Sequence, residues 1–194
     1  DIAQLVAPAL ASIREIITQA HDNGTGMPLS VVREKIQARM SDYAGFICHA
    51  DKVRRATRDA LLLNEFVQRH GLAIKHVGEV AELFMWRHMA LTSAAVLTQL
   101  THYIDAGGGS RGARIILDRD GNSIPQTRNG FCDAWRFRSE RTEDKKDKLL
   151  IHYCNGIFHV RETPVREFPI IRGIWFEKNW PGFLNGTIYQ PQDE

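Results

Sequence analysis

The sequence predicts a mainly α protein, a helical bundle around a long central helix with a small C-terminal β-hairpin and an irregular tail. Apolar residues recur at helical spacing through the first hundred residues, and this pattern stops at Gly107-Gly108-Gly109. Further on, Asn155-Gly156 lies between two alternating segments and favours a type I′ turn. We therefore expect residues 1–113 to form the bundle domain, and residues 114–194 to form an extended region with a hairpin and an aromatic-anchored tail that packs on it.

Three helices are expected before the central one. The first starts at Ile2, with a kink at Pro8, and ends in the glycine-containing segment 23–26. The second opens at residues 28–30. The third runs from about Asp51 and stops near Gly71, because glycine is a common residue just past a helix C-terminus.

The fourth helix, residues 77–106, carries apolar residues around its whole axis, which predicts a buried central position. Met85 and Met89 beside Trp86 are then expected to pack in the core, since methionine fills irregular gaps there, rather than to bind a cofactor. His88 and His102 on the same helix are expected to be interior polar groups.

The chain after the glycine run alternates between extended segments and turns. The charged run 140–148 is expected to be a solvated loop. Residues 149–160 predict the hairpin, with Ile151, Tyr153, Phe158 and Val160 toward the core. The tail is expected to be held by its aromatic side chains, which are Phe168, Trp175, Phe176 and Trp180.

Composition restricts the class of partner. The 25 Lys and Arg residues nearly balance 23 Asp and Glu residues, so the net charge of +2 predicts no nucleic-acid partner. The weakly charged segment 89–104 is shorter than the roughly 20 apolar residues of a membrane span, which predicts no membrane insertion. The basic side chains of the third helix are expected to be a solvated face. Three widely spaced cysteines offer no disulfide framework, which favours a reducing cytoplasm.

The segment 107–112 matches the pattern GxGxxG of dinucleotide-binding proteins. In those proteins the pattern follows a strand and opens a helix, so that backbone N–H groups meet the pyrophosphate. Here it follows a helix and precedes a strand. We therefore expect a glycine-rich helix stop and assign no cofactor-binding residue to this chain.

Three possible metal ligands lie on one face of the predicted hairpin. With Asn155-Gly156 as the turn, His152 is opposite His159, and Cys154 lies on the same face. A fourth ligand cannot be predicted, so the ordinary outer face of a hairpin explains these residues better than a metal site. The alternative, a small metal-dependent enzyme that uses them, stays open.

The order of landmarks in residues 30–113 resembles a known family. A short helix with the sequence Val-Arg-Glu-Lys-Ile-Gln-Ala-Arg-Met-Ser-Asp-Tyr-Ala-Gly-Phe precedes a charged helix and the long helix, and Ser110-Arg111-Gly112-Ala113 follows. This arrangement is similar to the C-terminal helical domain of the succinate dehydrogenase, fumarate reductase and L-aspartate oxidase flavoproteins. The sequence departs from the family at Arg114, where members usually have histidine, and at the three glycines, where a basic residue and glutamate are common.

The resemblance implies that the chain is a scaffold and interface domain. Family members bind FAD on an N-terminal domain whose motifs do not occur in this sequence. We therefore expect no catalytic residue and no cofactor in this chain, with FAD in the parent protein and its FAD-binding domain as the partner. Arg111 is expected to be a structural anchor at the end of the long helix. A freestanding helical protein-interaction module is the alternative function.

Overall fold

A computed structural model of the chain describes residues 2–22, 24–112, 114–126, 130–165 and 181–182. The chain divides into two compact units, residues 1–163 and residues 164–194. The predicted boundary at residue 113 lies inside the first unit. The aromatic anchors predicted for the tail lie outside the described residues.

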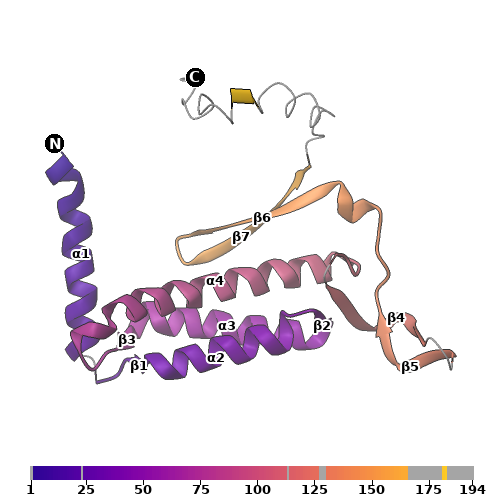
Figure 1. Ribbon diagram of the computed structural model, residues 1–194, viewed down its shortest axis with the longest axis horizontal. Helices are drawn as coiled ribbons and strands as arrows, with labels where there is room; N and C mark the ends of the chain where they lie inside the picture. The colour runs from indigo at the N-terminus through magenta and orange to yellow at the C-terminus, as the bar shows by residue number, and fades with distance from the viewer. Residues whose placement is uncertain (1, 23, 113, 127–129, 166–180, 183–194) are drawn as a thin grey trace. The chain divides into compact units, whose positions relative to one another are not determined.

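The first unit is mainly α, as the sequence predicts (Figure 1). The four α-helices of the described residues are α1 (Ile2–Asp22), α2 (Leu29–Tyr43), α3 (Ala50–His70) and α4 (Val80–Asp105), with a short 3₁₀ turn, η1 (Val77–Glu79), before α4. Helices α2, α3 and α4 lie side by side, whereas α1 extends away from one end of this group. Gly71 follows α3 with a positive φ of 72°, as expected for the residue that ends it.

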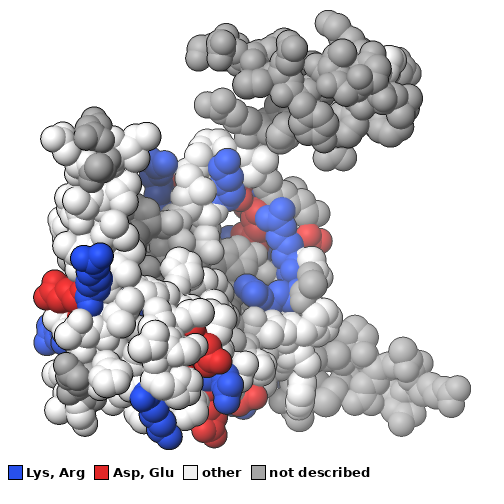
Figure 2. Space-filling view, turned by 60° about the vertical axis from the view of Figure 1, so that its left-hand side comes forward, with Lys and Arg blue, Asp and Glu red and all other residues white. Residues whose placement is uncertain are grey.

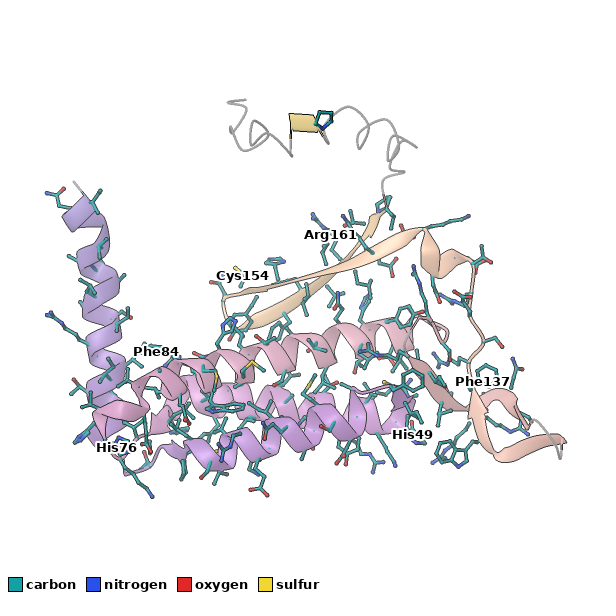
Figure 3. The ribbon with its side chains drawn as sticks, in the orientation of Figure 1. His49, His76, Phe84, Phe137, Cys154 and Arg161 are labelled. Carbon is teal, nitrogen blue, oxygen red and sulfur yellow. The ribbon has the colours of Figure 1, made fainter. Side chains whose placement is uncertain are left out.

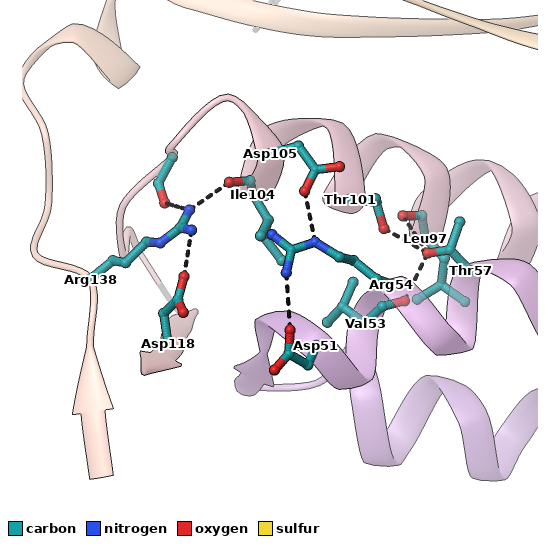
Figure 4. Close-up of polar contacts among 11 residues, drawn as sticks. Asp51, Val53, Arg54, Thr57, Leu97, Thr101, Ile104, Asp105, Asp118 and Arg138 are labelled. Carbon is teal, nitrogen blue, oxygen red and sulfur yellow. Dashed lines mark hydrogen bonds and ion pairs between the residues drawn. The ribbon is translucent and has the colours of Figure 1, made fainter. Parts of the chain in front are cut away.

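Small residues bring α3 and α4 close together. Ala56 and Ala60 of α3 and Ala94 of α4 are buried in one hydrophobic cluster. Between the helices, the Thr57 hydroxyl lies 2.9 Å from the Val53 carbonyl oxygen, 3.1 Å from that of Leu97 and 2.7 Å from the Thr101 hydroxyl (Figure 4). The buried hydroxyl is thereby satisfied where two backbones approach.

Burial on all sides of α4 was predicted wrongly. Its buried residues form one face that meets α2 and α3, whereas Met85 and Met89 are 47% and 37% exposed. His88 and His102 are exposed as well. Strand β6 (Asp147–Cys154) covers part of the opposite side, where the Gln99 amide donates to the Leu149 carbonyl oxygen at 2.6 Å. The apolar residues of α4 therefore include two that the described residues cover only in part.

Three small sheets complete the first unit. Strand β1 (Met27–Pro28) pairs in parallel with β3 (Leu72–Ala73), and β2 (Ile47–His49) pairs in parallel with β4 (Ile115–Gln126). Strand β5 (Gly130–Phe137) is antiparallel to β4. The β2–β4 pairing was not predicted, and it joins the start of α3 to the extended part of the chain.

Strands β6 and β7 (Ile157–Pro164) form the two-stranded sheet at the predicted hairpin. Asn155 and Gly156 both have positive φ, 50° and 82°, as a type I′ turn requires. Phe158 packs against the hydrophobic cluster of α3 and α4. Tyr153, predicted to face the core, is exposed, because it packs on the Phe158 ring, with ring centroids 4.8 Å apart, and not on the cluster itself.

Candidate functional site

The end of α4 is the centre of a polar cluster formed by Tyr103, Gly109, Arg111, Arg141 and Asp144, which we call the Asp144 cluster. It joins three segments: α4, the glycine loop that follows it, and a second 3₁₀ turn, η2 (Glu143–Lys145). The cluster contains Arg111, the residue for which the sequence predicted an anchoring role.

The glycine loop ends α4 with a standard backbone motif. Gly107 has a φ of 80° and its N–H donates to the Ile104 carbonyl oxygen at 3.0 Å, while the Gly108 N–H donates to that of Tyr103 at 2.9 Å. These two bonds are the Schellman pattern, which satisfies carbonyl groups left without partners at a helix end. The prediction of a glycine-rich helix stop is confirmed.

Close packing explains why the next two positions are also glycine. A Cβ atom on Gly108 would lie 2.5 Å from the Tyr103 ring, and one on Gly109 would lie 2.0 Å from the Ser139 carbonyl oxygen. Any side chain at Gly109 would displace backbone, because real Cβ contacts are longer than this. The run thus lets the chain after β5 pass directly against the end of α4.

Both carboxylate oxygens of Asp144 have hydrogen-bond partners. Oδ1 accepts from Arg141 Nη2 at 2.6 Å and Nε at 3.1 Å, a two-pronged ion pair. Oδ2 accepts from the Gly109 N–H at 2.9 Å and lies 2.7 Å from the Tyr103 hydroxyl. That hydroxyl is also 2.8 Å from the Gly109 carbonyl oxygen, and since it has one proton it donates to one of the two at a time.

The surroundings shift the pKa values of Asp144 and Tyr103. Burial by itself would raise the pKa of Asp144, whose side chain is 4% exposed, but the hydrogen bonds from Arg141, Gly109 and Tyr103 lower it further than burial raises it. Burial, followed by the hydrogen bond to Asp144, raises the pKa of Tyr103 to about 12. Near neutral pH the carboxylate is therefore charged and the phenol is protonated.

Two arginines donate hydrogen bonds to backbone carbonyl groups at the end of α4. Arg138 Nη1 donates to the Ile104 carbonyl oxygen at 2.5 Å and its Nη2 pairs with Asp118 at 2.5 Å (Figure 4). Arg141 Nη1 donates to the Ala106 carbonyl oxygen at 3.3 Å. Positive charge is favourable at this end of the helix dipole.

Arg111 is another arginine near the end of α4, and it contacts η2. Its Nη1 donates to the backbone carbonyl oxygen of Asp144, and its N–H donates to the Arg114 carbonyl oxygen at 3.0 Å. It therefore binds η2, whereas Arg138 and Arg141 contact carbonyl groups at the end of α4.

A second site lies at the start of α3, where its first turn, β4 and β5 surround an open pocket of about 570 Å³. His49, labelled in Figure 3, precedes the helix and contacts the Trp135 ring edge-on, with ring centroids 5.9 Å apart. Burial, and then the charge of Lys52, lowers the pKa of His49, so its imidazole is neutral at pH 7. Lys52 and Arg55, which the sequence assigned to a solvated face, line this pocket.

Two of the three metal-ligand candidates come together in the hairpin. The rings of His152 and His159 stack with centroids 5.0 Å apart, and Cys154 is exposed on the side away from α4 (Figure 3). Among the described residues no group of three or more His, Cys, Asp or Glu side chains is arranged to hold a metal ion. The structure thus shows a cross-strand histidine pair at this place.

Comparisons with family models, with curated proteins and with solved structures found no match to this chain. Within the part of the chain that is described, no helix is long and apolar enough to cross a membrane.

Proposed function

We propose that this chain is a helical scaffold and interface domain of an FAD-dependent oxidoreductase that resembles succinate dehydrogenase and fumarate reductase, with α4 as its central helix. The observation that carries the proposal is the uncovered apolar face of α1. Ile2, Val6, Leu10 and Ile13 are between 40% and 80% exposed.

These four residues share one side of the helix. They follow one another at spacings of four, four and three residues, which keeps successive side chains on one stripe at about 100° per residue. Gln4 and Glu15 lie on the opposite side. Covering one large aliphatic side chain is worth about 1.5–3 kcal/mol, so a partner that covers this stripe gains substantial free energy.

Helix α4 adds a second uncovered apolar surface. Met85 and Met89, four residues apart on one side of the helix, are exposed, whereas Phe84, labelled in Figure 3, lies on a different side and is half-buried. Methionine side chains adapt to the shape of a partner surface. The partner that we propose for these surfaces is the FAD-binding domain of the parent flavoprotein, because residues 30–113 resemble the domain that packs on it in that family.

The Asp144 cluster supports a structural role for the other end of α4. Its carboxylate oxygens, the Tyr103 hydroxyl and the carbonyl oxygens of Ile104 and Ala106 have partners within the chain. A general acid or base must instead reach a proton of the substrate. These groups fix the chain that follows β5 against α4, which is what a scaffold requires.

The coding sequence upstream of Asp1, or the neighbouring gene, gives the first test. A strand-turn-helix unit with the GxGxxG pattern in either place would support the proposal. The absence of such a unit from both places would contradict it and would favour a freestanding interaction module.

The second test compares two variants of the assembled flavoprotein. Leu10→Asp puts a charge on the apolar stripe, whereas Gln4→Asp puts the same charge on the exposed opposite side of α1. We expect Leu10→Asp to lower the flavin content of the purified protein, since a buried unpaired charge costs several kcal/mol. Equal flavin content in both variants would exclude this face as the interface.

A further inference from the structure

The pocket at the start of α3 has no part in the proposed function. Its volume of about 570 Å³ lies within the range of roughly 300–1,000 Å³ that is typical of small-molecule sites. It is formed by the first turn of α3, the first half of β4 and the end of β5.

The lining of the pocket carries excess positive charge. Its cationic side chains are those of Lys52, Arg55, Arg119 and Arg136. Its two carboxylates already have arginine partners from outside the lining: Asp51 is 3.1 Å from Arg54, and Asp118 is 2.5 Å from Arg138. Arg119 is a further 3.6 Å partner of Asp51. The other three lining cations are therefore left without a carboxylate of the pocket within salt-bridge distance.

This excess is local. On the face shown in Figure 2, basic and acidic side chains lie side by side. An adjoining depression shares Asp51, Arg55 and Arg119 with the pocket and extends to Arg54 and Arg58. The pocket thus opens onto a short continuation of the same basic surface, which attracts anions over a limited distance.

The backbone of α3 adds to the preference for an anion. Ala50, Asp51 and Lys52 of the first turn line the pocket, and the side chain of His49 forms no capping hydrogen bond with that turn. N–H groups at a helix start point toward anions that bind there. On the other wall the Trp135 indole is 47% exposed, and its edge-on contact with His49 holds it at the pocket.

We propose that this pocket binds a phosphate ester that carries a planar ring, as a nucleoside monophosphate does. The phosphate lies among Lys52, Arg55 and the first turn of α3, and the ring stacks on Trp135. Guanidinium groups bind phosphate oxygens through paired hydrogen bonds, and stacking on an exposed indole accepts any flat ring.

Calorimetric titration of the full chain with adenosine monophosphate, inorganic phosphate and adenosine at one ionic strength tests both parts of the site. We expect the monophosphate to bind more tightly than either fragment. Arg55→Gln should weaken binding of the monophosphate and of phosphate by about tenfold, the loss of one charge-assisted contact. Trp135→Ala should weaken binding of the monophosphate and of adenosine and leave phosphate binding unchanged.

Arg33→Gln is the matched control, because Arg33 is an exposed basic residue of α2 outside the pocket. This variant should bind all three probes with the same affinity as the wild-type chain. An equal loss in Arg33→Gln and Arg55→Gln would overturn the proposal, since diffuse charge would then explain binding. The proposal would also be overturned if adenosine monophosphate bound no more tightly than inorganic phosphate, or did not bind. Lys52→Gln, a second exposed position in the pocket, replaces Arg55→Gln if thermal melting shows that the latter is unfolded.

Discussion

The Tyr103 hydroxyl and Asp144 Oδ2 are 2.7 Å apart although 41 residues separate them in the sequence. Between them the chain leaves α4, forms β4 and β5, and returns through η2 to the end of the helix it left. This hydrogen bond joins the two ends of that segment, and the Gly109 N–H donates to the same carboxylate oxygen. The stability of the extended region therefore depends on groups at the end of α4.

Asp144→Asn should lower the free energy of unfolding by about 1–3 kcal/mol at neutral pH, because the variant loses a charged partner of Arg141 in a nearly buried position. Urea denaturation measures the difference. Glu143→Gln removes a neighbouring charge that is exposed, and it should stay within about 0.5 kcal/mol of the unchanged chain.

The same pair of variants has a defined pH dependence. The folded-state pKa of Asp144 lies below its usual 3.8, so its stabilisation is complete above that value and is lost as the pH falls through the folded-state pKa. The gap between the unchanged chain and Asp144→Asn should accordingly narrow as the pH falls below about 4. A gap that stays constant would show that the charge of Asp144 contributes nothing.

Tyr103 should titrate at higher pH than an ordinary tyrosine. Its folded-state pKa is raised to about 12, so the stability it provides is present below the unfolded-state pKa near 10 and is lost as the pH rises from there toward about 12. In an ultraviolet pH titration, a late phase should be absent from Tyr103→Phe. Tyr153→Phe is the control, because Tyr153 is exposed on the hairpin. Loss of the late phase in Tyr153→Phe would contradict the assignment.

Much of the helical part could be predicted from the sequence because the signals are local. Apolar spacing located α1 to α4, and Gly71 and Gly107 ended helices where a positive φ was needed. The Asn155-Gly156 turn is local in the same sense. The β2–β4 pairing could not be predicted, since β2 has three residues and its partner lies beyond two helices.

The Asp144 cluster shows why the candidate site was harder to predict. The run 140–148 was expected to be solvated, and the structure contradicts this for Asp144, because Arg141, Gly109 and Tyr103 supply partners that make its burial possible. Two of these three partners lie more than thirty residues away. Charge patterning along a sequence cannot show such a partner, whereas the position of Arg111 beside the glycine run could be read directly.

Overpacking usually lowers the free energy of unfolding by about 1–3 kcal/mol. Gly109→Ala should lower it by more than this, because its Cβ would lie 2.0 Å from the Ser139 carbonyl oxygen. A flexible side chain could rotate away, but the Ser139 carbonyl cannot move without breaking the pairing around it. Gly24→Ala is the control, because a Cβ there has open space within 4 Å. It should change stability by less than about 0.5 kcal/mol. Equal melting temperatures in the two variants would show that the loop does not approach the chain after β5 as described.

Leu97→Asp and Met85→Asp test which side of α4 faces the core. The sequence treats the two positions alike, since both belong to the apolar pattern around the helix, but the structure places Leu97 at 0% and Met85 at 47% exposure. An unpaired carboxylate at Leu97 would lose its hydration among Ala56, Ala60 and Ala94, at a cost of several kcal/mol. At Met85 the carboxylate stays in water, and the change should remain within about 1 kcal/mol in the isolated chain. In the flavoprotein that we propose as the parent protein, Met85→Asp should lower flavin retention, because the proposed interface covers that residue. A large loss of stability from Met85→Asp in the isolated chain would mean that the chain itself buries this side of α4, and the surface would then be part of the core.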